Sequence, residues 1–418
     1  MDKIRIVGGN KLQGEVKIGG SKNSTLPLMA ASILANEKCV LHNVPKVQDV
    51  RSMELVLNAL GIQVNRENEH TLIIDPIGLS GYEAPYDLVR KMRASIYVLG
   101  PLLAKLKKAR VSLPGGCAIG LRPVNLHIKG IQALGAKVEI EEGFINATAD
   151  KLKGTEIYLD IPSVGATVNI MLAAVVAEGK TLIENAAQEP EIEDVANFMN
   201  KMGARITGAG TPVIQIEGVE ELVAAEHTVI PDRIEAGTYI IAAALTQGNV
   251  KVTNAVLDHL LAVQTKLVEA GVRIIQEKNG LRVTVPNGFR PTDIKTNPYP
   301  GFPTDLQAQF MTLMSITEGN SVISETIWEN RFMHVSELQR MGANIRIQGT
   351  SAFVTGVPYL SGAPVMASDL RASAALVLAG LVAKGETLIN RVYHLDRGYE
   401  SLEEKFTRLG ATIERIKE

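Results

Sequence analysis

A glycine-rich loop around one cysteine is the segment of this sequence with the clearest chemical potential. Residues 113–122 read LPGGCAIGLR, so three glycines surround Cys117 and the guanidinium of Arg122 follows five residues later. Glycines let a backbone approach a ligand closely, and a nearby cation favours the thiolate form of cysteine. Two interpretations fit equally: a reactive thiol, and an inert small side chain in a surface loop. Cys39 lies in a strand-like run and is expected to be buried packing.

Three further segments place charged side chains at helix starts or in tight loops. Residues 19–25 read GGSKNST and open an apolar run, where serine and asparagine can cap a helix and Lys22 can hold a phosphate. Residues 297–305 read NPYPGFPTD, and the prolines lead Asp305 to a helix start, as either an N-cap or a functional carboxylate. Residues 393–398 read YHLDRG, in which Arg397 is either an anion ligand or half of a surface ion pair.

The composition excludes several classes of function. The chain has 418 residues with 46% hydrophobic and 21% charged residues, enough for two or three domains. Its formal net charge of -2 indicates neither nucleic acid nor a membrane surface as partner. The longest apolar run, residues 372–383, is about half the length that spans a bilayer. The N-terminus is charged where a signal peptide would be apolar, the two cysteines form no C-x-x-C pair, and no H-x-x-x-H pair predicts a metal site.

An internal repeat dominates the organisation of the chain. An alanine-rich apolar run, a turn and an alternating, strand-like segment recur six times, and the turns fall at Glu37, Lys108, Gly179, Gly248, Gly319 and Gly385, at intervals of 71, 71, 69, 71 and 66 residues. Each run is apolar on nearly all sides, which is typical of a buried helix, and the following segment has the pattern of a strand. The repeat predicts six α/β units that split three and three near residues 230–232.

The first residues of these apolar runs carry an unexpected charge. They are Lys22, Arg93, Ser163–Val164, Arg233, Thr304–Asp305 and Arg371, so four of the six runs begin with a cation. A cation beside the positive end of a helix dipole is unfavourable. Either this is chance, or several of these helix N-termini receive anionic ligands.

These segments, together with others along nearly the whole chain, resemble the enolpyruvyl transferase family, and within it the enzymes that act on UDP-N-acetylglucosamine. The motifs are residues 21–23, 92–95, 113–127, 162–167, 231–235, 298–305, 329–334, 369–373 and 396–399. The resemblance implies an α/β fold of two similar domains, each of three βαβαββ units around buried helices, an inside-out α/β barrel. It implies an active site in the interdomain cleft, one domain over 21–229 with the Cys117 loop, and a second over 1–20 and 230–418.

The resemblance also implies the reaction. Such an enzyme transfers the enolpyruvyl group of phosphoenolpyruvate to the 3-hydroxyl of UDP-N-acetylglucosamine by addition and elimination, and releases phosphate, in the first committed step of peptidoglycan biosynthesis. Cys117 would donate the proton to C3 and could carry a covalent adduct, and Asp305 would be the base on the sugar hydroxyl. Phosphoenolpyruvate would be held by Lys22, Arg122 and Arg397, supported by Arg93 and Arg371.

The remaining implied contacts concern the sugar nucleotide. The expected residues are Asn23, Arg122, Pro123, Val124, Asn125, Leu126, Ser163, Val164, Gly165, Asp305, Ile327 and Arg331. The resemblance further implies a cytoplasmic monomer without cofactor or metal, and without nucleic acid or membrane partners.

Two positions depart from the family pattern. Asn125 stands where the family often has aspartate, which would alter uridine binding without abolishing it, and Tyr97 replaces a frequent tryptophan. One alternative is the related transferase for shikimate 3-phosphate, whose pattern lacks the Gly-Gly-Cys loop and has serine at the position of Asn23. Another is a catalytically idle sugar-nucleotide binding protein, against which the combined presence of Lys22, Cys117, Asp305 and Arg397 argues.

Overall fold

The chain folds into two compact units. The computed structural model describes residues 2–89, 92–113 and 124–417, and of Arg93 only the backbone. Unit I lies within residues 20–230, and unit II comprises residues 2–19 and 231–417. Within the described residues, the chain passes from one unit to the other at Gly19–Gly20 and at Ile230–Pro231.

Six four-stranded sheets share one topology. Counted across each sheet, the first strand is parallel to the second, the third is antiparallel to the second, and the fourth is antiparallel to the third. In unit I the sheets are β14 (Glu226–Thr228), β3 (Cys39–His42), β5 (Thr71–Asp75), β4 (Gln63–Asn68); β6 (Glu83–Ala84), β7 (Lys108–Ser112), β9 (Phe144–Thr148), β8 (Lys137–Glu141); and β10 (Glu156–Tyr158), β11 (Lys180–Glu184), β13 (Val213–Glu217), β12 (Arg205–Thr207). In unit II they are β2 (Gln13–Lys17), β15 (Asn249–Thr253), β17 (Gly280–Thr284), β16 (Arg273–Glu277); β18 (Ile294–Lys295), β19 (Asn320–Ser324), β21 (Ser351–Thr355), β20 (Asn344–Gln348); and β22 (Pro364–Met366), β23 (Glu386–Asn390), β1 (Lys3–Val7), β24 (Thr412–Ile416). The six α/β units predicted from the repeat are thereby confirmed.

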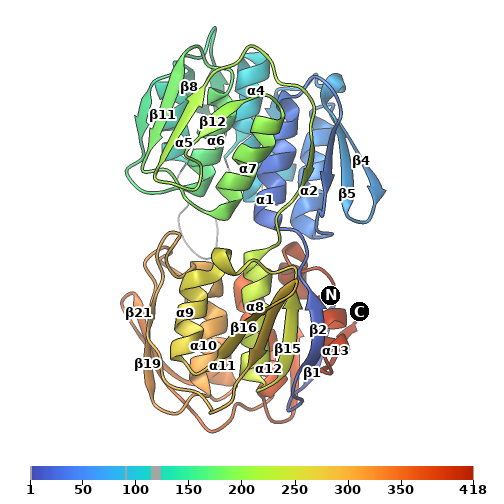
Figure 1. The fold of residues 1–418 in the computed structure, drawn as a ribbon, viewed down its shortest axis with the longest axis vertical. Coiled ribbons are helices and arrows are strands. Elements are labelled where there is room, and N and C mark those ends of the chain that lie inside the picture. Colours follow the sequence, from blue (N-terminus) through green and yellow to red (C-terminus); the bar gives the residue numbers. More distant parts are fainter. Residues whose placement is uncertain (1, 90–91, 114–123, 418) are drawn as a thin grey trace. The chain divides into compact units, whose positions relative to one another are not determined.

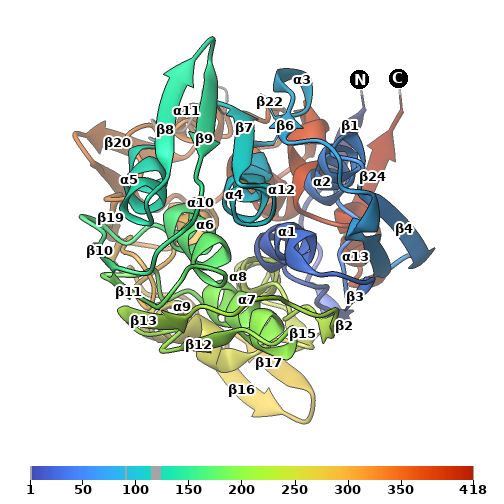
Figure 2. The same cartoon turned by 90° about the horizontal axis from the view of Figure 1, so that it is seen from above.

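In each unit the most deeply buried helices lie at the centre, and the sheets lie around them (Figures 1 and 2). Unit I contains α1 (Lys22–Ala31), α2 (Gln48–Ala59), α3 (Tyr86–Val89), α4 (Leu99–Leu106), α5 (Asn125–Ala133), α6 (Val164–Ala174) and α7 (Pro190–Lys201), and the 3-10 helices η1 (Ser32–Leu34), η2 (Pro76–Gly78) and η3 (Arg93–Val98). Unit II contains α8 (Arg233–Leu245), α9 (Leu261–Glu269), α10 (Gln307–Ser315), α11 (Val335–Arg340), α12 (Leu370–Val382) and α13 (Leu402–Arg408), and η4 (Leu257–Leu260), η5 (Thr304–Leu306) and η6 (Val392–Arg397). Each described sheet is open, so the barrel is a ring of separate sheets around helices.

Small residues allow the buried helices to pack closely. All residues of α12 except its last are buried, as its nearly uniform apolar sequence predicts. A Cβ atom added to Gly237 of α8 would lie 2.4 Å from Cδ1 of Leu306 in η5. A Cβ atom on Gly100 of α4 would lie 2.4 Å from the carbonyl oxygen of Asn169 in α6. Larger side chains at these two positions would push the central helices apart.

The two passages between units occupy equivalent places in the repeat. Strand β2 precedes α1 in the chain but pairs with β15 of unit II, and β14 precedes α8 but pairs with β3 of unit I. Each passage thus separates an edge strand from the buried helix that follows it, so each unit contains one edge strand from a distant part of the sequence.

Local predictions agree closely with the structure. α1 and α8 begin at Lys22 and Arg233, and α6 begins at Val164. Gly61, Gly203, Gly342 and Gly410 each follow a helix and have φ angles of 92°, 100°, 93° and 93°, which a glycine adopts without strain. Two turns of the repeat lie one residue before the predicted positions 108 and 248, because the residues with a left-handed backbone are Lys107 and Gln247. The amphipathic helices α2 and α7 begin at Gln48 and Pro190.

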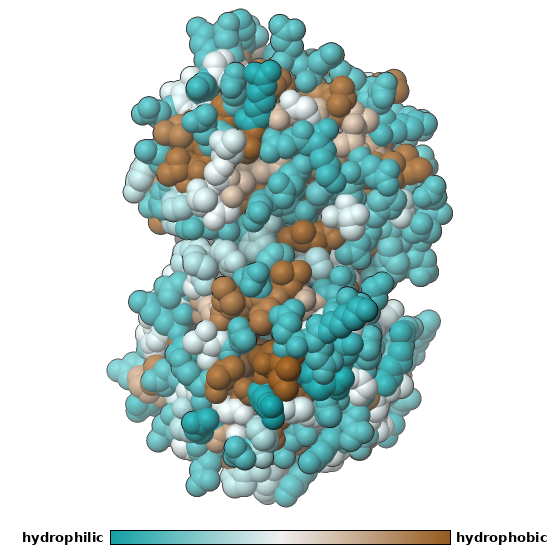
Figure 3. Space-filling view, viewed as in Figure 1, coloured by the Kyte–Doolittle hydropathy of each residue, from teal (hydrophilic) through white to brown (hydrophobic). Residues whose placement is uncertain are grey.

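On the face drawn in Figure 3, hydrophilic residues cover most of each unit and apolar residues form small separate groups. Within the described parts of the chain, no helix combines the length and the hydropathy needed to cross a membrane.

Candidate active site

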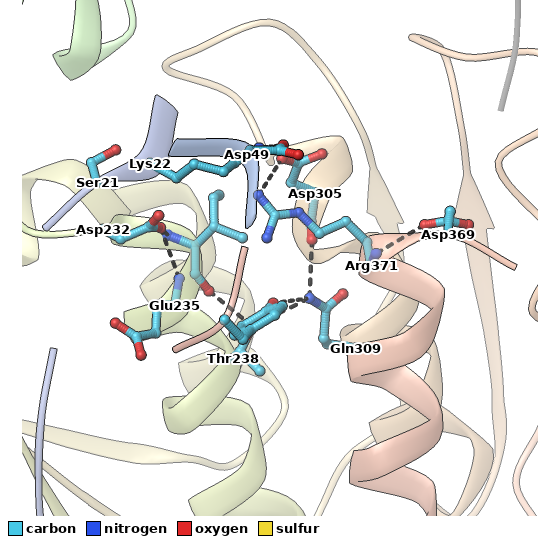
Figure 4. Close-up of polar contacts among 12 residues, drawn as sticks. Ser21, Lys22, Asp49, Asp232, Glu235, Thr238, Asp305, Gln309, Asp369 and Arg371 are labelled. Carbon is cyan, nitrogen blue, oxygen red and sulfur yellow. Dashed lines mark hydrogen bonds and ion pairs between the residues drawn. The ribbon is translucent and has the colours of Figure 1, made fainter. Parts of the chain in front are cut away.

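In unit II, two buried arginines hold one partly exposed carboxylate. Asp305 lies in η5, and its two carboxylate oxygens accept hydrogen bonds from Arg331 and from Arg371, each at 2.8 Å (Figure 4 shows the second). The two arginine side chains are 4% and 5% exposed, whereas that of Asp305 is 28% exposed. Asp305 does not cap α10, so that alternative is wrong. Its carboxylate is held in a fixed orientation but remains within reach of water and of a ligand.

The charge of Arg371 is secured by its surroundings. Burial alone would lower the pKa of this guanidinium, but Asp305, Tyr399 and Asp232 together outweigh burial and raise it. Arg371 lies in the first turn of α12, where the carboxylate of Asp369 caps the helix by accepting from the backbone N–H groups of residues 371 and 372. A permanently charged, immobile guanidinium therefore stands beside Asp305.

A buried glutamate connects the loop of Ile327 to the start of η5. One oxygen of Glu325 accepts from the backbone N–H of Ile327 at 2.8 Å and from the hydroxyl of Thr296 at 2.8 Å. The other oxygen accepts from the hydroxyl of Thr304, the neighbour of Asp305, at 2.8 Å. Unit II thus fixes the predicted residues Ile327 and Asp305 through the same side chain.

Arg397 ends η6, which packs against the start of α12. A Cβ atom on Gly398 would lie 2.7 Å from Cδ2 of Leu370, so a larger residue here would require the Leu370 side chain to move. Asp396, the acidic neighbour that suggested a surface ion pair with Arg397, binds Arg415 through two hydrogen bonds of 2.5 and 3.0 Å. Asp396 therefore has a guanidinium partner of its own.

In unit I, Lys22 is paired with a buried aspartate. Its Nζ lies 3.0 Å from Oδ2 of Asp49 in the first turn of α2, and the two side chains are 11% and 3% exposed. Ser21 caps α1 by accepting from the N–H of Ser24 at 3.3 Å, and Asn23 follows in the first turn. The cation at this helix start is thus matched by a carboxylate from a neighbouring helix.

The starts of α5 and α6 meet through a histidine. Ser163 caps α6 by accepting from the N–H of Ala166 at 3.3 Å, and Val164 and Gly165 form the first turn. A Cβ atom on Gly165 would lie 2.9 Å from Cε1 and 3.0 Å from Nε2 of His127 in α5. Unit I thereby brings the predicted residues Ser163, Val164 and Gly165 to the helix that begins with Asn125 and Leu126, after Val124.

The tautomer of His127 follows from its neighbour. Asn169 accepts from the backbone N–H of Gly100 at 2.9 Å and donates to the carbonyl of Ile96 at 3.1 Å, which fixes the orientation of its amide. The same amide nitrogen lies 2.8 Å from Nδ1 of His127, so Nδ1 accepts and Nε2 carries the proton. Burial lowers the pKa of His127 to about 4, so the ring is neutral near pH 7. A neutral N–H donor therefore lies beside the first turn of α6.

Some predicted site residues cannot be placed. Cys117, Arg122 and Pro123 lie outside the described residues, as does the side chain of Arg93. Sequence reasoning missed Asp49, Glu325 and His127 as partners of predicted residues. Only His127 gave a signal, because it ends the motif of residues 113–127. Among the described residues, no group of three or more His, Cys, Asp or Glu side chains is arranged to hold a metal ion.

Comparisons with known proteins agree on the family. The family model of EPSP synthase (3-phosphoshikimate 1-carboxyvinyltransferase) matches residues 6–406. UDP-N-acetylglucosamine 1-carboxyvinyltransferase 1 of Caldanaerobacter subterraneus subsp. tengcongensis is 58% identical over 97% of each chain, and the UDP-N-acetylglucosamine 1-carboxyvinyltransferase of Desulfatibacillum aliphaticivorans is 56% identical over the full length of both. The crystal structure of the enolpyruvyl transferase NikO from Streptomyces tendae superposes with a TM-score of 0.90 at 26% identity, covering 99% of this chain and 98% of that one. EPSP synthase from Acinetobacter baumannii shares the fold, with a TM-score of 0.76 at 18% identity over both full chains.

Proposed function

The chain belongs to the enolpyruvyl transferase family, and we propose that it transfers the enolpyruvyl group of phosphoenolpyruvate to the 3-hydroxyl of UDP-N-acetylglucosamine, with release of phosphate. The acceptor is supported by full-length relatives at 56–58% identity that carry the name UDP-N-acetylglucosamine 1-carboxyvinyltransferase. The observation that carries the chemistry is the Asp305 carboxylate, partly exposed and held by two buried guanidinium groups.

The proposed reaction divides into addition and elimination. In the addition, the 3-hydroxyl oxygen bonds to C2 of phosphoenolpyruvate, its proton passes to Asp305, and C3 gains a proton from Cys117. In the elimination, C3 returns a proton to the Cys117 thiolate, the bond between C2 and the phosphate oxygen breaks, and the double bond returns; the departing phosphate takes up the proton held by Asp305. Arg371 and Arg331 orient the Asp305 carboxylate, so little reorganisation is needed when the hydroxyl proton is transferred.

Anionic substrates require cationic ligands. We propose that Lys22, Arg122 and Arg397, with Arg93 and Arg371, bind the phosphate and carboxylate of phosphoenolpyruvate. The Lys22–Asp49 ion pair supports this role, because it holds the ammonium group in one place while leaving it partly exposed. We propose that Asn23, residues 122–126 and residues 163–165 bind the sugar nucleotide in unit I, with Ile327 and Arg331 in unit II. The first-turn N–H groups of α6 suit its diphosphate.

Phosphate release decides among the candidate functions. The protein is mixed with phosphoenolpyruvate and either UDP-N-acetylglucosamine or shikimate 3-phosphate, in the presence of a chelator. We expect phosphate only with UDP-N-acetylglucosamine. Equal release with both acceptors, or loss of release on chelation, would contradict the proposal. Binding of the sugar nucleotide without any phosphate release would identify an idle binding protein.

A further inference from the structure

A network of buried polar groups lies behind the Arg371–Asp305 ion pair, and the reaction as described does not use it. The Tyr399 hydroxyl lies 2.8 Å from the Thr238 hydroxyl, and both residues are buried. Nε2 of Gln309 lies 3.3 Å from the Thr238 hydroxyl, 3.4 Å from that of Tyr399 and 3.0 Å from the backbone oxygen of Asp305. In Figure 4, Gln309 lies between Thr238 and the backbone of Asp305. The network therefore connects α8, α10 and the segment after η6.

The donors in this network are assigned from the Thr238 hydroxyl outward. The Thr238 hydroxyl donates its single proton to the carbonyl of Ile234, at 2.8 Å. It therefore accepts from Tyr399, whose phenol proton is used in that bond, and also from Gln309. Burial raises the pKa of Tyr399, so the phenol stays protonated. The lone pairs of the phenol oxygen are left to accept from other donors.

The nearest strong donor is the arginine that holds Asp305. The guanidinium carbon of Arg371 lies 5.7 Å from the centroid of the Tyr399 ring. Burial has the larger effect on the pKa of Tyr399, and the positive charge of Arg371 acts against it. Because Gly398 packs against Leu370, the segment that carries Tyr399 is fixed against the start of α12. The Tyr399 side chain is therefore a direct neighbour of the Arg371 guanidinium.

We propose that Tyr399 is a positioning residue for the transferase reaction: with Thr238 and Gln309 it fixes Arg371, and through it the Asp305 carboxylate, in the orientation that receives the hydroxyl proton. This inference rests on the proposed function. Asp305 is constrained twice, at its carboxylate through Arg371 and at its backbone oxygen through Gln309. A carboxylate free to rotate would spend less time aligned with the sugar hydroxyl, so loss of the phenol hydroxyl lowers turnover more than substrate affinity.

The test removes single hydroxyl groups. Tyr399→Phe and Thr238→Val are expected to lower kcat about tenfold or more, with KM for both substrates within about threefold of the original protein. Thr238→Ser keeps the hydroxyl and should restore most of the turnover. Tyr239→Phe is the matched control: Tyr239 is the next residue along α8, equally buried, and its hydroxyl has no hydrogen-bond partner among the described residues. This control should leave kcat unchanged.

A second background separates positioning from general stability. If Tyr399 acts through Asp305, then Tyr399→Phe introduced into Asp305→Asn should lower kcat no further. If Tyr399 has a purely structural role, Tyr399→Phe should leave kcat unchanged at temperatures well below unfolding, or should lower it equally in the original protein and in Asp305→Asn. Either result overturns the inference. If the unmodified protein releases no phosphate, the proposed function itself fails. If it does and Tyr399→Phe turns over normally, only this inference fails.

Discussion

Replacing Asp305 by asparagine tests the central claim about the active site. The substitution keeps the shape of the side chain and removes its negative charge and its basicity. General bases contribute on the order of 10²–10⁴ to rate, so kcat should fall by about that factor. The two arginines lose their shared anion but remain cationic, and they can still attract a substrate anion. Affinity for UDP-N-acetylglucosamine should therefore stay within about tenfold.

The same substitution should affect stability in a predictable way. Removing one partner of a buried ion pair typically costs about 3–5 kcal/mol, because a buried charge is left uncompensated. The Asp305 side chain is 28% exposed, so water replaces part of the lost interaction. We therefore expect the free energy of unfolding to fall by about 1–3 kcal/mol, measured by urea titration.

A surface carboxylate of unit II provides the matched control. Glu386 accepts from Arg5 at 2.7 Å, but the two side chains are 51% and 40% exposed, and exposed pairs contribute about 0–1 kcal/mol. Glu386→Gln should change stability by less than about 1 kcal/mol and leave phosphate release unchanged. Normal turnover of Asp305→Asn would refute the role of Asp305 as base. A stability loss no larger than that of the control would refute the argument that the two buried arginines depend on its charge.

Three further predictions concern other residues. Fosfomycin should alkylate Cys117, and the Cys117→Asp variant should be active and resistant. Cys39 is fully buried and burial raises its pKa, so it should not react. A peptide map that shows the label on Cys39 would contradict this prediction. Burial lowers the pKa of His127 from 6.5 to about 4, so as pH falls the unfolded chain binds a proton at this histidine before the folded chain does. The stability that neutral His127 provides is therefore complete above about pH 6.5, and the free energy of unfolding should fall by about 2 kcal/mol by pH 5. His127→Gln should abolish that part of the pH dependence in urea titrations, and an unchanged slope would show that other groups cause it. Asp49→Asn should lower kcat/KM for phosphoenolpyruvate about tenfold by releasing Lys22, with no additional loss in a Lys22→Ala background; additive losses would mean that Asp49 acts independently.

The fold could be predicted because its signals are local. Each buried helix is encoded by a short apolar run, and the turn after it by residues that tolerate a left-handed backbone. The start of α8 at Arg233 was therefore found to the residue. The pairing of β2 with β15, more than two hundred residues away, has no local signal. Neither strand pattern specifies its partner, so only the packed structure reveals which edge strand completes which sheet.

The sequence indicates candidate site residues but not the contacts that they make. Asp305 was identified from its motif, but its partners lie 26 and 66 residues further along the chain. The packing of η5, α12 and the segment that carries Arg331 decides which arginine reaches which oxygen. In the same way, the Nε2–H tautomer of His127 depends on the amide of Asn169, which no spacing rule connects to it. Contacts of this kind depend on the relative placement of helices.

The cations at the helix starts contact different kinds of protein groups, and this affects whether they indicate an anionic substrate. Arg233 lies 5.4 Å above the ring of Tyr299, so one cation at a helix start contacts an aromatic ring. Lys22 and Arg371 each meet a protein carboxylate, which offsets the unfavourable helix dipole without any ligand. A cation at a helix start is therefore weak evidence for an anionic substrate by itself. The exposure of the carboxylate partner distinguishes a structural ion pair from one that can take part in the reaction. Asp49 is almost fully buried and keeps Lys22 in place, whereas Asp305 is accessible enough to exchange a proton with a bound hydroxyl.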